Sequence, residues 1–369
     1  MTLDAVNAMM RVAVADGIFP GGVLCVSCRG RIVFHEAYGL ADIYTKTPVT
    51  TETVFDLASL TKPIATAPAV MRLVTEGEVS VTDPIGGRLP GFSETDKHRI
   101  TIAQLLCHCS GLPAHREFFY DLARLPAGER RAALTERLVA TKLVYPPGER
   151  VLYSDLGYMV LRCIVEAVSG HRLDMFVEDK VYRPLGITGL FFVPLHETES
   201  RAEGIDKGRF AATEDCPRRG FVVKGVVHDD NAYEAGGVDG HAGLFGTTAA
   251  VHAMMTELLA IYRKTSYDGT ISHDAVKHML EPQLQTRRTF GFDTPDAYAS
   301  SAGTRFSGHT VGHLGFTGTS VWMDVARDIV VVLLTNRVHP NRKNEAIRDF
   351  RPALHDAVMD VLTDSGKPD

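Results

Sequence analysis

Hydrophobic residues near the start of the chain recur at helical spacing and then give way to strand-like runs. The helical pattern covers residues 3–15 and stops before Gly17, a residue type common just after a helix. Two apolar runs follow, at residues 22–27 and 31–38, and the short polar link between them is typical of a β-hairpin. The apolar face of the predicted helix consists of Leu3, Val6, Met10 and Ala13.

The last third of the chain repeats this combination of strands and helix. Residues 320–325 and 328–335 form a second hairpin pattern, and residues 343–362 read as a closing helix. The segment 313–316 has the character of an edge strand. We therefore expect both chain ends to contribute to one antiparallel sheet layer flanked by helices.

The middle of the chain, from about residue 60 to 227, is mainly helical in pattern with long connections. Residues 130–141 and 156–169 are predicted helices, the second ending at Gly170, and residues 197–219 are polar and irregular, as in a surface loop. The sequence thus predicts a discontinuous α/β domain (1–60 and 228–369) with an inserted, mainly helical domain (61–227). Small-molecule sites favour domain interfaces, so we expect a catalytic cleft between the two.

Composition narrows the class of protein. The 369 residues are 45% hydrophobic and 23% charged, with a net charge of −6, which describes an ordinary globular protein. The absence of a basic cluster argues against nucleic acid as a partner, and the longest aliphatic run, residues 329–334, is too short to span a membrane. No signal peptide is visible, which predicts a cytoplasmic location, and the six cysteines are then expected to be free thiols.

Candidate chemistry begins at Ser59-Leu60-Thr61-Lys62. The preceding residues read as extended, so Ser59 can open a helix that runs to about Thr75. Residues three apart share a helix face, which places the Ser59 hydroxyl beside the Lys62 amine. A hydroxyl next to an amine is a nucleophile next to its base, provided that burial lowers the lysine pKa. Helix capping by Ser59 is compatible with this role.

Two later motifs join this one, Tyr153-Ser154-Asp155 and His313-Leu314-Gly315. With them the chain resembles the serine penicillin-recognising superfamily, in the branch of the class C β-lactamases and their DD-peptidase, esterase and amidase relatives, whose motifs are Ser-x-x-Lys, Tyr-x-Asn and Lys-Thr-Gly or His-x-Gly. The resemblance covers nearly the whole chain. It includes Gly21-Gly22-Val23, Tyr38-Gly39, Leu105 to Pro113, Pro147-Gly148, Pro184-Leu185-Gly186, Gly236 to Phe245 and Leu334-Thr335-Asn336.

The resemblance implies an α/β fold of the α+β type, β-lactamase/transpeptidase-like, with an antiparallel sheet flanked by helices and an inserted α-rich domain. It implies that Ser59 is the nucleophile, that Lys62 is its base and that Tyr153 exchanges protons in deacylation. The N–H of Phe316 would pair with that of Ser59 as an oxyanion hole, and Gly315 would let the strand approach the substrate. No metal or cofactor is implied.

Four other residues bear on the site. Asp155 stands where the β-lactamase pattern has asparagine, so an acceptor-only carboxylate replaces an amide that also donates. His313 replaces lysine, which weakens the fixed positive charge expected for a β-lactam carboxylate. Both changes disfavour efficient β-lactamase activity. His228 and His241 either line the cleft or are hydrogen-bonded loop histidines.

The leading functional prediction is a serine hydrolase that forms an acyl-enzyme on Ser59 with amide or ester substrates related to peptidoglycan fragments. A carboxylesterase and a weak β-lactamase are alternative enzymes. A catalytically idle sensor or assembly protein on the same fold is an alternative from another class, which the intact Ser59, Lys62 and Tyr153 oppose. The expected partner is a small molecule or peptide, with no nucleic acid and no membrane. The oligomeric state and the stereochemical preference stay open.

Overall fold

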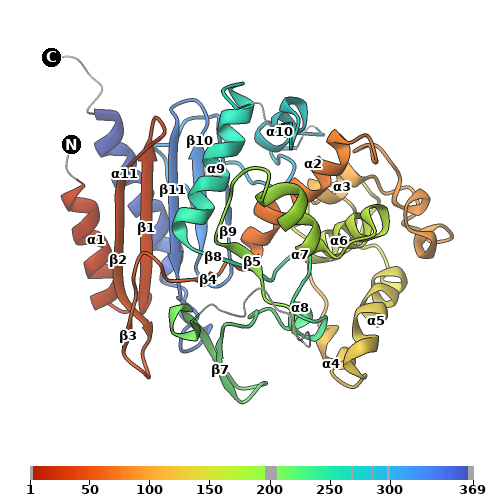
Figure 1. Cartoon of the computed structure of the whole chain (residues 1–369), viewed down its shortest axis with the longest axis horizontal. Coiled ribbons are helices and arrows are strands. Elements are labelled where there is room, and N and C mark those ends of the chain that lie inside the picture. The colour runs from red at the N-terminus through yellow and green to blue at the C-terminus, as the bar shows by residue number, and fades with distance from the viewer. Residues whose placement is uncertain (1–2, 196–205, 267–268, 285, 297–299, 365–369) are drawn as a thin grey trace.

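The computed structural model describes residues 3–195, 206–266, 269–284, 286–296 and 300–364. A six-stranded antiparallel sheet occupies one half of the molecule, in the order β3-β2-β1-β11-β10-β9 (Figure 1). Both chain ends contribute to it, as the two hairpin patterns predicted. Its strands are β1 (Gly21–Cys28), β2 (Arg31–Asp42), β3 (Thr47–Pro48), β9 (Thr310–Leu314), β10 (Ser320–Asp324) and β11 (Ile329–Thr335).

The two chain ends meet at the pairing of β1 with β11, where Gly22 lies opposite Thr335. Alternate side chains of a strand point to opposite faces, and here both faces are covered. Leu24 and Val26 pack against α1 (Asp4–Ala15) and α11 (Ile347–Asp364), whereas Val23 and Cys25 belong to the larger core on the other face. Burial on both sides explains why β11 is a continuous apolar run.

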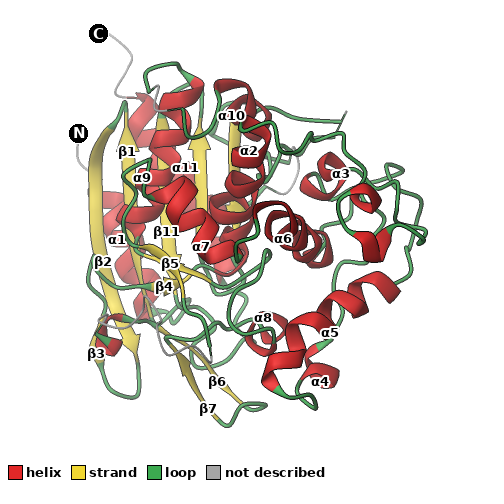
Figure 2. Ribbon diagram, turned by 45° about the vertical axis from the view of Figure 1, so that its right-hand side comes forward, coloured by secondary structure: helices red, strands yellow, loops and turns green. Residues whose placement is uncertain are grey.

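Helices make up most of the other half of the molecule (Figures 1 and 2). The predicted helices over 130–141 and 156–169 are present as α5 and α6, and Gly170 ends α6 with a left-handed φ of 70°. The remaining bounds are α2 (Ala67–Thr75), α3 (Ile102–Leu106), α4 (Phe119–Leu122), α5 (Ala127–Ala140), α6 (Asp155–Ser169), α7 (Leu173–Val177), α8 (Asp230–Glu234), α9 (Thr248–Tyr262) and α10 (His273–Leu280).

Two small sheets lie beside the large one. β4 (Phe55–Asp56), β8 (Leu244–Gly246) and β5 (Leu190–Phe192) form the first, and β6 (Ala212–Cys216) with β7 (Phe221–Lys224) forms the second. The second corrects the expectation of an irregular loop over 197–219. Residues 197–205 of that prediction lie outside the described residues, but 212–216 pair with β7 as a strand in which every residue except Asp215 is buried.

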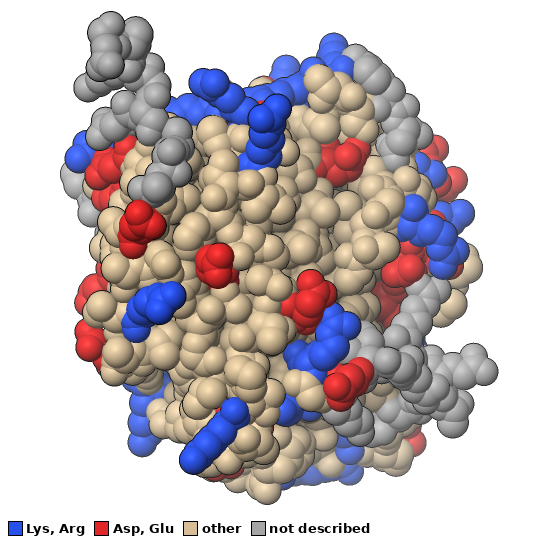
Figure 3. Space-filling model, turned by 60° about the vertical axis from the view of Figure 1, so that its left-hand side comes forward, with Lys and Arg blue, Asp and Glu red and all other residues tan. Residues whose placement is uncertain are grey.

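Charged residues of both signs are scattered over a largely uncharged surface on the face drawn in Figure 3. Within the described residues, no helix is long and apolar enough to cross a membrane. The domain boundaries predicted near residues 60 and 227 stay a prediction.

Candidate active site

The turn that carries Ser59 is strained and firmly held. Ala58 adopts a left-handed φ of 47°, uncommon for a residue with a Cβ, and its N–H donates to Asp56 Oδ1 at 2.8 Å. Ser59 then sits in a short 3₁₀ turn, Ala58–Leu60, and is partly exposed. The predicted single helix over 59–75 is in fact this turn, a π-helical segment (Lys62–Thr66) and α2. π-segments are frequent at functional sites.

Lys62 lies at the centre of the site with its side chain fully buried. Its Nζ donates to Ser59 Oγ at 2.9 Å, to Asp155 Oδ1 at 2.8 Å and to the carbonyl oxygen of His241 at 3.2 Å. Three acceptors match the three protons of an ammonium group. The predicted pairing of Ser59 with Lys62 is therefore present in the geometry.

The charge of Lys62 differs from the expectation that burial would leave it unprotonated. Burial lowers the pKa of the Lys62 ammonium, but the attraction of Asp155 and the contacts with Tyr153 outweigh it and raise that pKa above its ordinary value. Burial also raises the pKa of Asp155, yet Lys62 and a hydrogen bond from His115 bring it far below its usual range. Lys62 and Asp155 thus form an ion pair in the resting site.

Tyr153 packs beside the Lys62–Asp155 ion pair. It directly precedes Ser154, the residue that caps the N-terminus of α6. The Ser154 hydroxyl accepts from the N–H of Gly157 and donates to the carbonyl of Pro113, so it caps the helix and fixes the residues on either side. Lys62 Nζ lies 4.8 Å from the centre of the Tyr153 ring. Burial raises the pKa of Tyr153, against the lowering effect of Lys62 and of a hydrogen bond with Ser59, so the phenol is neutral.

His108 supports Tyr153 from behind. Its ring lies 4.5 Å from the Tyr153 ring, and its Nδ1 accepts from the N–H of Ser154 at 3.0 Å. Burial and nearby cations hold the pKa of His108 well below its usual value, as an acceptor nitrogen requires. The flanking Cys107 and Cys109 are buried free thiols, in agreement with the sequence prediction.

The third motif closes the site from the edge of the large sheet. His313 lies near the end of β9, and Gly315 follows against the Ser59 turn: a Cβ there would lie 2.0 Å from Thr319 Oγ1 and 2.6 Å from the carbonyl oxygen of Leu57. Only glycine fits this approach. Within the part of the chain that the structure describes, the N–H groups of Ser59 and Phe316 donate to no protein acceptor.

Arg337 holds the Phe316 peptide. Its Nε and Nη2 donate to the Phe316 carbonyl at 2.9 and 2.6 Å, and its guanidinium lies 4.7 Å from the centre of the half-exposed Phe316 ring. On the same wall His228 stacks on Phe316 at 5.6 Å, while its Nε2 contacts Glu214 at 3.1 Å. Phe316 is thus fixed from two sides.

His313 is a neutral group in this structure. Burial and the nearby Lys62 and Arg288 lower the pKa of His313 to about 3, and its Nδ1 lies 2.8 Å from the carbonyl oxygen of Leu314. It therefore supplies no cation to the site, in line with the weaker positive charge expected where histidine replaces lysine.

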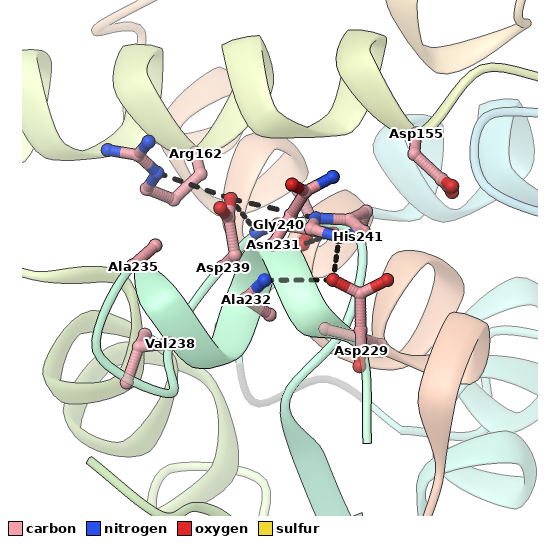
Figure 4. Close-up of polar contacts among 12 residues, drawn as sticks. Asp155, Arg162, Asp229, Asn231, Ala232, Ala235, Val238, Asp239, Gly240 and His241 are labelled. Carbon is pink, nitrogen blue, oxygen red and sulfur yellow. Dashed lines mark hydrogen bonds and ion pairs between the residues drawn. The ribbon is translucent and has the colours of Figure 1, made fainter. Parts of the chain in front are cut away.

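His241, whose backbone carbonyl accepts from Lys62, carries a positive charge. Burial lowers its pKa, but Asp229, 2.9 Å from Nε2, and Asp239, 3.8 Å from Nδ1, raise it to about 10. Asp239 in turn contacts Arg162 of α6 at 3.4 Å. Figure 4 shows this alternating chain of charges, which anchors the loop whose carbonyl accepts from Lys62.

A cavity of about 620 Å³ brings these groups together. Its lining includes Ser59, Tyr153, Asp155, His228, His241, His313, Gly315 and Phe316 from the predicted set. Lys62 lies beneath Ser59. His115 and Asp229 also line the cavity but were not predicted as site residues from the sequence. His115 lies two residues after Pro113, the end of a segment that carries the family resemblance. Among the described residues no cluster of three or more His, Cys, Asp or Glu is arranged to hold a metal ion.

Comparison with known proteins adds a family context. Residues 6–354 match the sequence model of the family described as Beta-lactamase. A Bacillus subtilis (strain 168) protein named N-acetylmuramyl-L-alanine amidase is 33% identical over 368 residues, covering 91% of this chain and 81% of that protein. An Escherichia coli (strain K12) protein named "Putative D-alanyl-D-alanine carboxypeptidase" is 33% identical over 352 residues, covering 87% of this chain and 79% of that protein.

A solved structure is similar over almost the whole fold. The octameric penicillin-binding protein homologue from Pyrococcus abyssi superposes with a TM-score of 0.73 at 21% identity, covering 98% of this chain and 77% of that one. At this identity the likeness concerns the fold alone, which is β-lactamase/transpeptidase-like, as the motifs predicted.

Proposed function

The chain belongs to the beta-lactamase family, and from this premise we propose that it is a serine hydrolase that cleaves amide bonds in peptidoglycan-derived peptides through an acyl ester on Ser59. The observation that carries the proposal is the 2.9 Å hydrogen bond from Lys62 Nζ to Ser59 Oγ beside the cavity. The names of the two bacterial relatives support the choice of an amide of this class.

The protonation states support a division of labour. The Lys62 ammonium cannot accept a proton, but it stabilises negative charge as it develops on Ser59 Oγ. Neutral Tyr153, in hydrogen-bonding contact with Ser59 and Lys62, accepts the Ser59 proton while passing its own to the leaving nitrogen. The carbonyl oxygen of the substrate is held by the N–H groups of Ser59 and Phe316. Water, activated through the same tyrosine, then hydrolyses the acyl ester.

The β-lactam alternative is weak on this arrangement. His313 is neutral, so the third motif offers no fixed cation, and Asp155 is committed to Lys62. An ester substrate would need no protonation of a leaving nitrogen, so a carboxylesterase stays an alternative for the substrate panel to test.

The test combines labelling with substrates. A fluorophosphonate probe should add mass to the peptide that contains Ser59, and Ser59→Ala should abolish the adduct, whereas Ser93→Ala, an exposed serine outside the cavity lining, should not. An adduct on another serine, or none, would contradict the mechanism and favour the idle protein. A panel of muramyl peptides, D-alanyl-D-alanine peptides, p-nitrophenyl esters and nitrocefin should show highest turnover on one of the peptide classes.

A further inference from the structure

Basic side chains gather at one end of the large sheet, where four separate turns of the chain meet. These turns are the β1–β2 hairpin, the β10–β11 hairpin, the segment that follows α9 and the segment that precedes β9. Lys and Arg side chains form a band along the upper rim of the view in Figure 3. The basic surface consists of six exposed residues from these turns and the strand ends beside them: Arg29, Arg31, Arg263, Lys264, Arg305 and Arg327.

Contacts between the turns hold the basic surface together. The N–H of Arg29 donates to the carbonyl oxygen of Asp328 at 2.7 Å, which joins the two hairpins. Arg263 Nη1, from the segment after α9, lies 2.6 Å from Asp328 Oδ2. Arg327 Nη1 donates to the carbonyl oxygen of Arg305 at 2.8 Å, which adds the segment before β9. The four turns therefore form one continuous patch.

Only half of the positive charges in the basic surface are balanced by the protein. Three of its arginines pair with aspartates at distances of 2.6 to 3.5 Å. The other three cations, Arg29, Arg31 and Lys264, form no ion pair within the part of the chain that the structure describes. Unbalanced exposed cations attract anions, and here they do so on a chain whose net charge is −6.

Exposed aliphatic side chains border these three cations. Ile32 and Val33 follow Arg31 along β2 and are 49% and 45% exposed. β3 pairs with β2 only at Leu40 and Asp42, so among the described residues no strand covers the outer edge of β2 at this point. The end of the sheet thus presents apolar groups and cations together.

This combination favours a lipid surface over a nucleic acid. Peripheral membrane proteins attach through cations that meet anionic headgroups and apolar side chains that enter the interface. A nucleic-acid groove instead combines cations with aromatic side chains on which bases stack, and none of the six residues or their two aliphatic neighbours is aromatic.

We propose that the basic surface, together with Ile32 and Val33, adsorbs the protein to lipid bilayers that carry anionic phosphate headgroups. The inference is independent of the proposed function, because none of these residues lines the catalytic cavity. It departs from the expectation of no membrane partner, which rested on a sequence in which these six residues are spread over positions 29 to 327. Adsorption needs no spanning helix, and the described residues contain none.

The test measures co-sedimentation of the full chain with two kinds of vesicle. The wild type should bind vesicles of equal parts phosphatidylglycerol and phosphatidylcholine, and should bind vesicles of phosphatidylcholine alone at least ~10-fold more weakly. Raising the salt concentration from about 0.1 M to about 1 M should release most of the bound protein, because the screening length falls from about 10 Å to about 3 Å.

A pair of triple variants tests which cations bind. Arg29→Gln/Arg31→Gln/Lys264→Gln should bind the anionic vesicles about 100-fold more weakly, at about fivefold for each cation removed. The matched control Arg99→Gln/Arg124→Gln/Lys142→Gln removes the same charge from exposed positions outside the basic surface and should leave binding unchanged. Equal losses in the two triple variants, or equal wild-type binding to both kinds of vesicle, would overturn the inference.

The aliphatic pair separates a bilayer from a soluble polyanion. Ile32→Ser/Val33→Ser should weaken binding to the anionic vesicles by about tenfold and should leave binding to polyphosphate unchanged, because a soluble polymer has no apolar layer. Binding to polyphosphate or duplex DNA without binding to vesicles would overturn the inference. Fluorophosphonate labelling of Ser59 in each variant checks that its cavity is intact. Failure of the wild type to label would contradict the proposed function and leave this inference standing.

Discussion

Replacing Asp155 by asparagine tests the ion pair at the centre of the site. The Lys62 side chain is fully buried, the Asp155 side chain is 19% exposed, and the two lie 2.8 Å apart. Breaking a buried pair costs about 3–5 kcal/mol, because one charge is left without a partner. The partial exposure of Asp155 and the amide oxygen that the substitution retains reduce this, so we expect a loss of about 2–3 kcal/mol in the free energy of unfolding.

This free energy translates into a measurable melting shift. At about 2.1 cal/mol/K per residue, a chain of 369 residues has an unfolding entropy of roughly 0.8 kcal/mol/K. A loss of about 2–3 kcal/mol then lowers Tm by about 3–4 °C. Differential scanning calorimetry of the wild type and Asp155→Asn at pH 7 is the measurement, with Asp349→Asn as control at an exposed position.

The pH dependence follows from the directions of the two pKa shifts. Asp155 has a depressed pKa, so its stabilisation is present above about pH 4, the unfolded value, and is lost as pH falls through the folded value. Lys62 has a raised pKa, so its stabilisation is present below about pH 10.4 and is lost as pH rises through the folded value. The Tm difference should therefore be constant from about pH 5 to 9 and shrink in strong acid.

Two results would refute this reasoning. Equal Tm values for the wild type and Asp155→Asn from about pH 5 to 9 would mean that the pair adds no stability. A wild-type free energy of unfolding that rises steadily with pH across the same range would mean that Lys62 is neutral in the resting protein, because it would then take up a proton on unfolding.

Three further predictions concern the same site. Lys62→Ala and Tyr153→Phe should each lower turnover by at least ~100-fold, and the double variant should be little worse than the poorer single one, because the two act as a unit; fully multiplicative losses would refute the coupling. Gly315→Ala should lower Tm by several degrees, because its Cβ would clash with Thr319 and Leu57. Gly308→Ala, whose Cβ meets open space, should leave Tm unchanged. Equal Tm values for the two variants would show that the backbone around Gly315 can move away from Thr319 and Leu57 at little cost. Arg337→Ala should lower kcat by about tenfold with little change in KM, because it releases the Phe316 peptide, whose N–H is proposed to hold the substrate oxygen. Arg337→Lys should recover part of the loss. A change confined to KM would instead assign Arg337 to substrate binding.

The sequence by itself determined the outline of the fold. The elements it predicted well have strictly local causes, such as the 3.6-residue periodicity of α1 and the left-handed glycine that ends α6. The motif order also identified the family, because Ser59, Tyr153 and His313 occur in sequence with the right neighbours. The β6–β7 hairpin was missed because Thr213, Glu214 and Asp215 are polar, so the sequence shows no apolar alternation, although Thr213 and Glu214 are buried in the structure.

Only the tertiary structure decided the protonation states of the site residues. Burial of Lys62 could be guessed from its neighbours, and burial alone predicts a neutral amine. The carboxylate that reverses this prediction stands 93 residues away, at the start of α6. His115 and Asp229 are likewise ordinary loop residues until folding brings them to the same cavity. A pKa depends on the distance to every nearby charge in a medium of low dielectric constant, and the order of residues along a chain does not contain those distances.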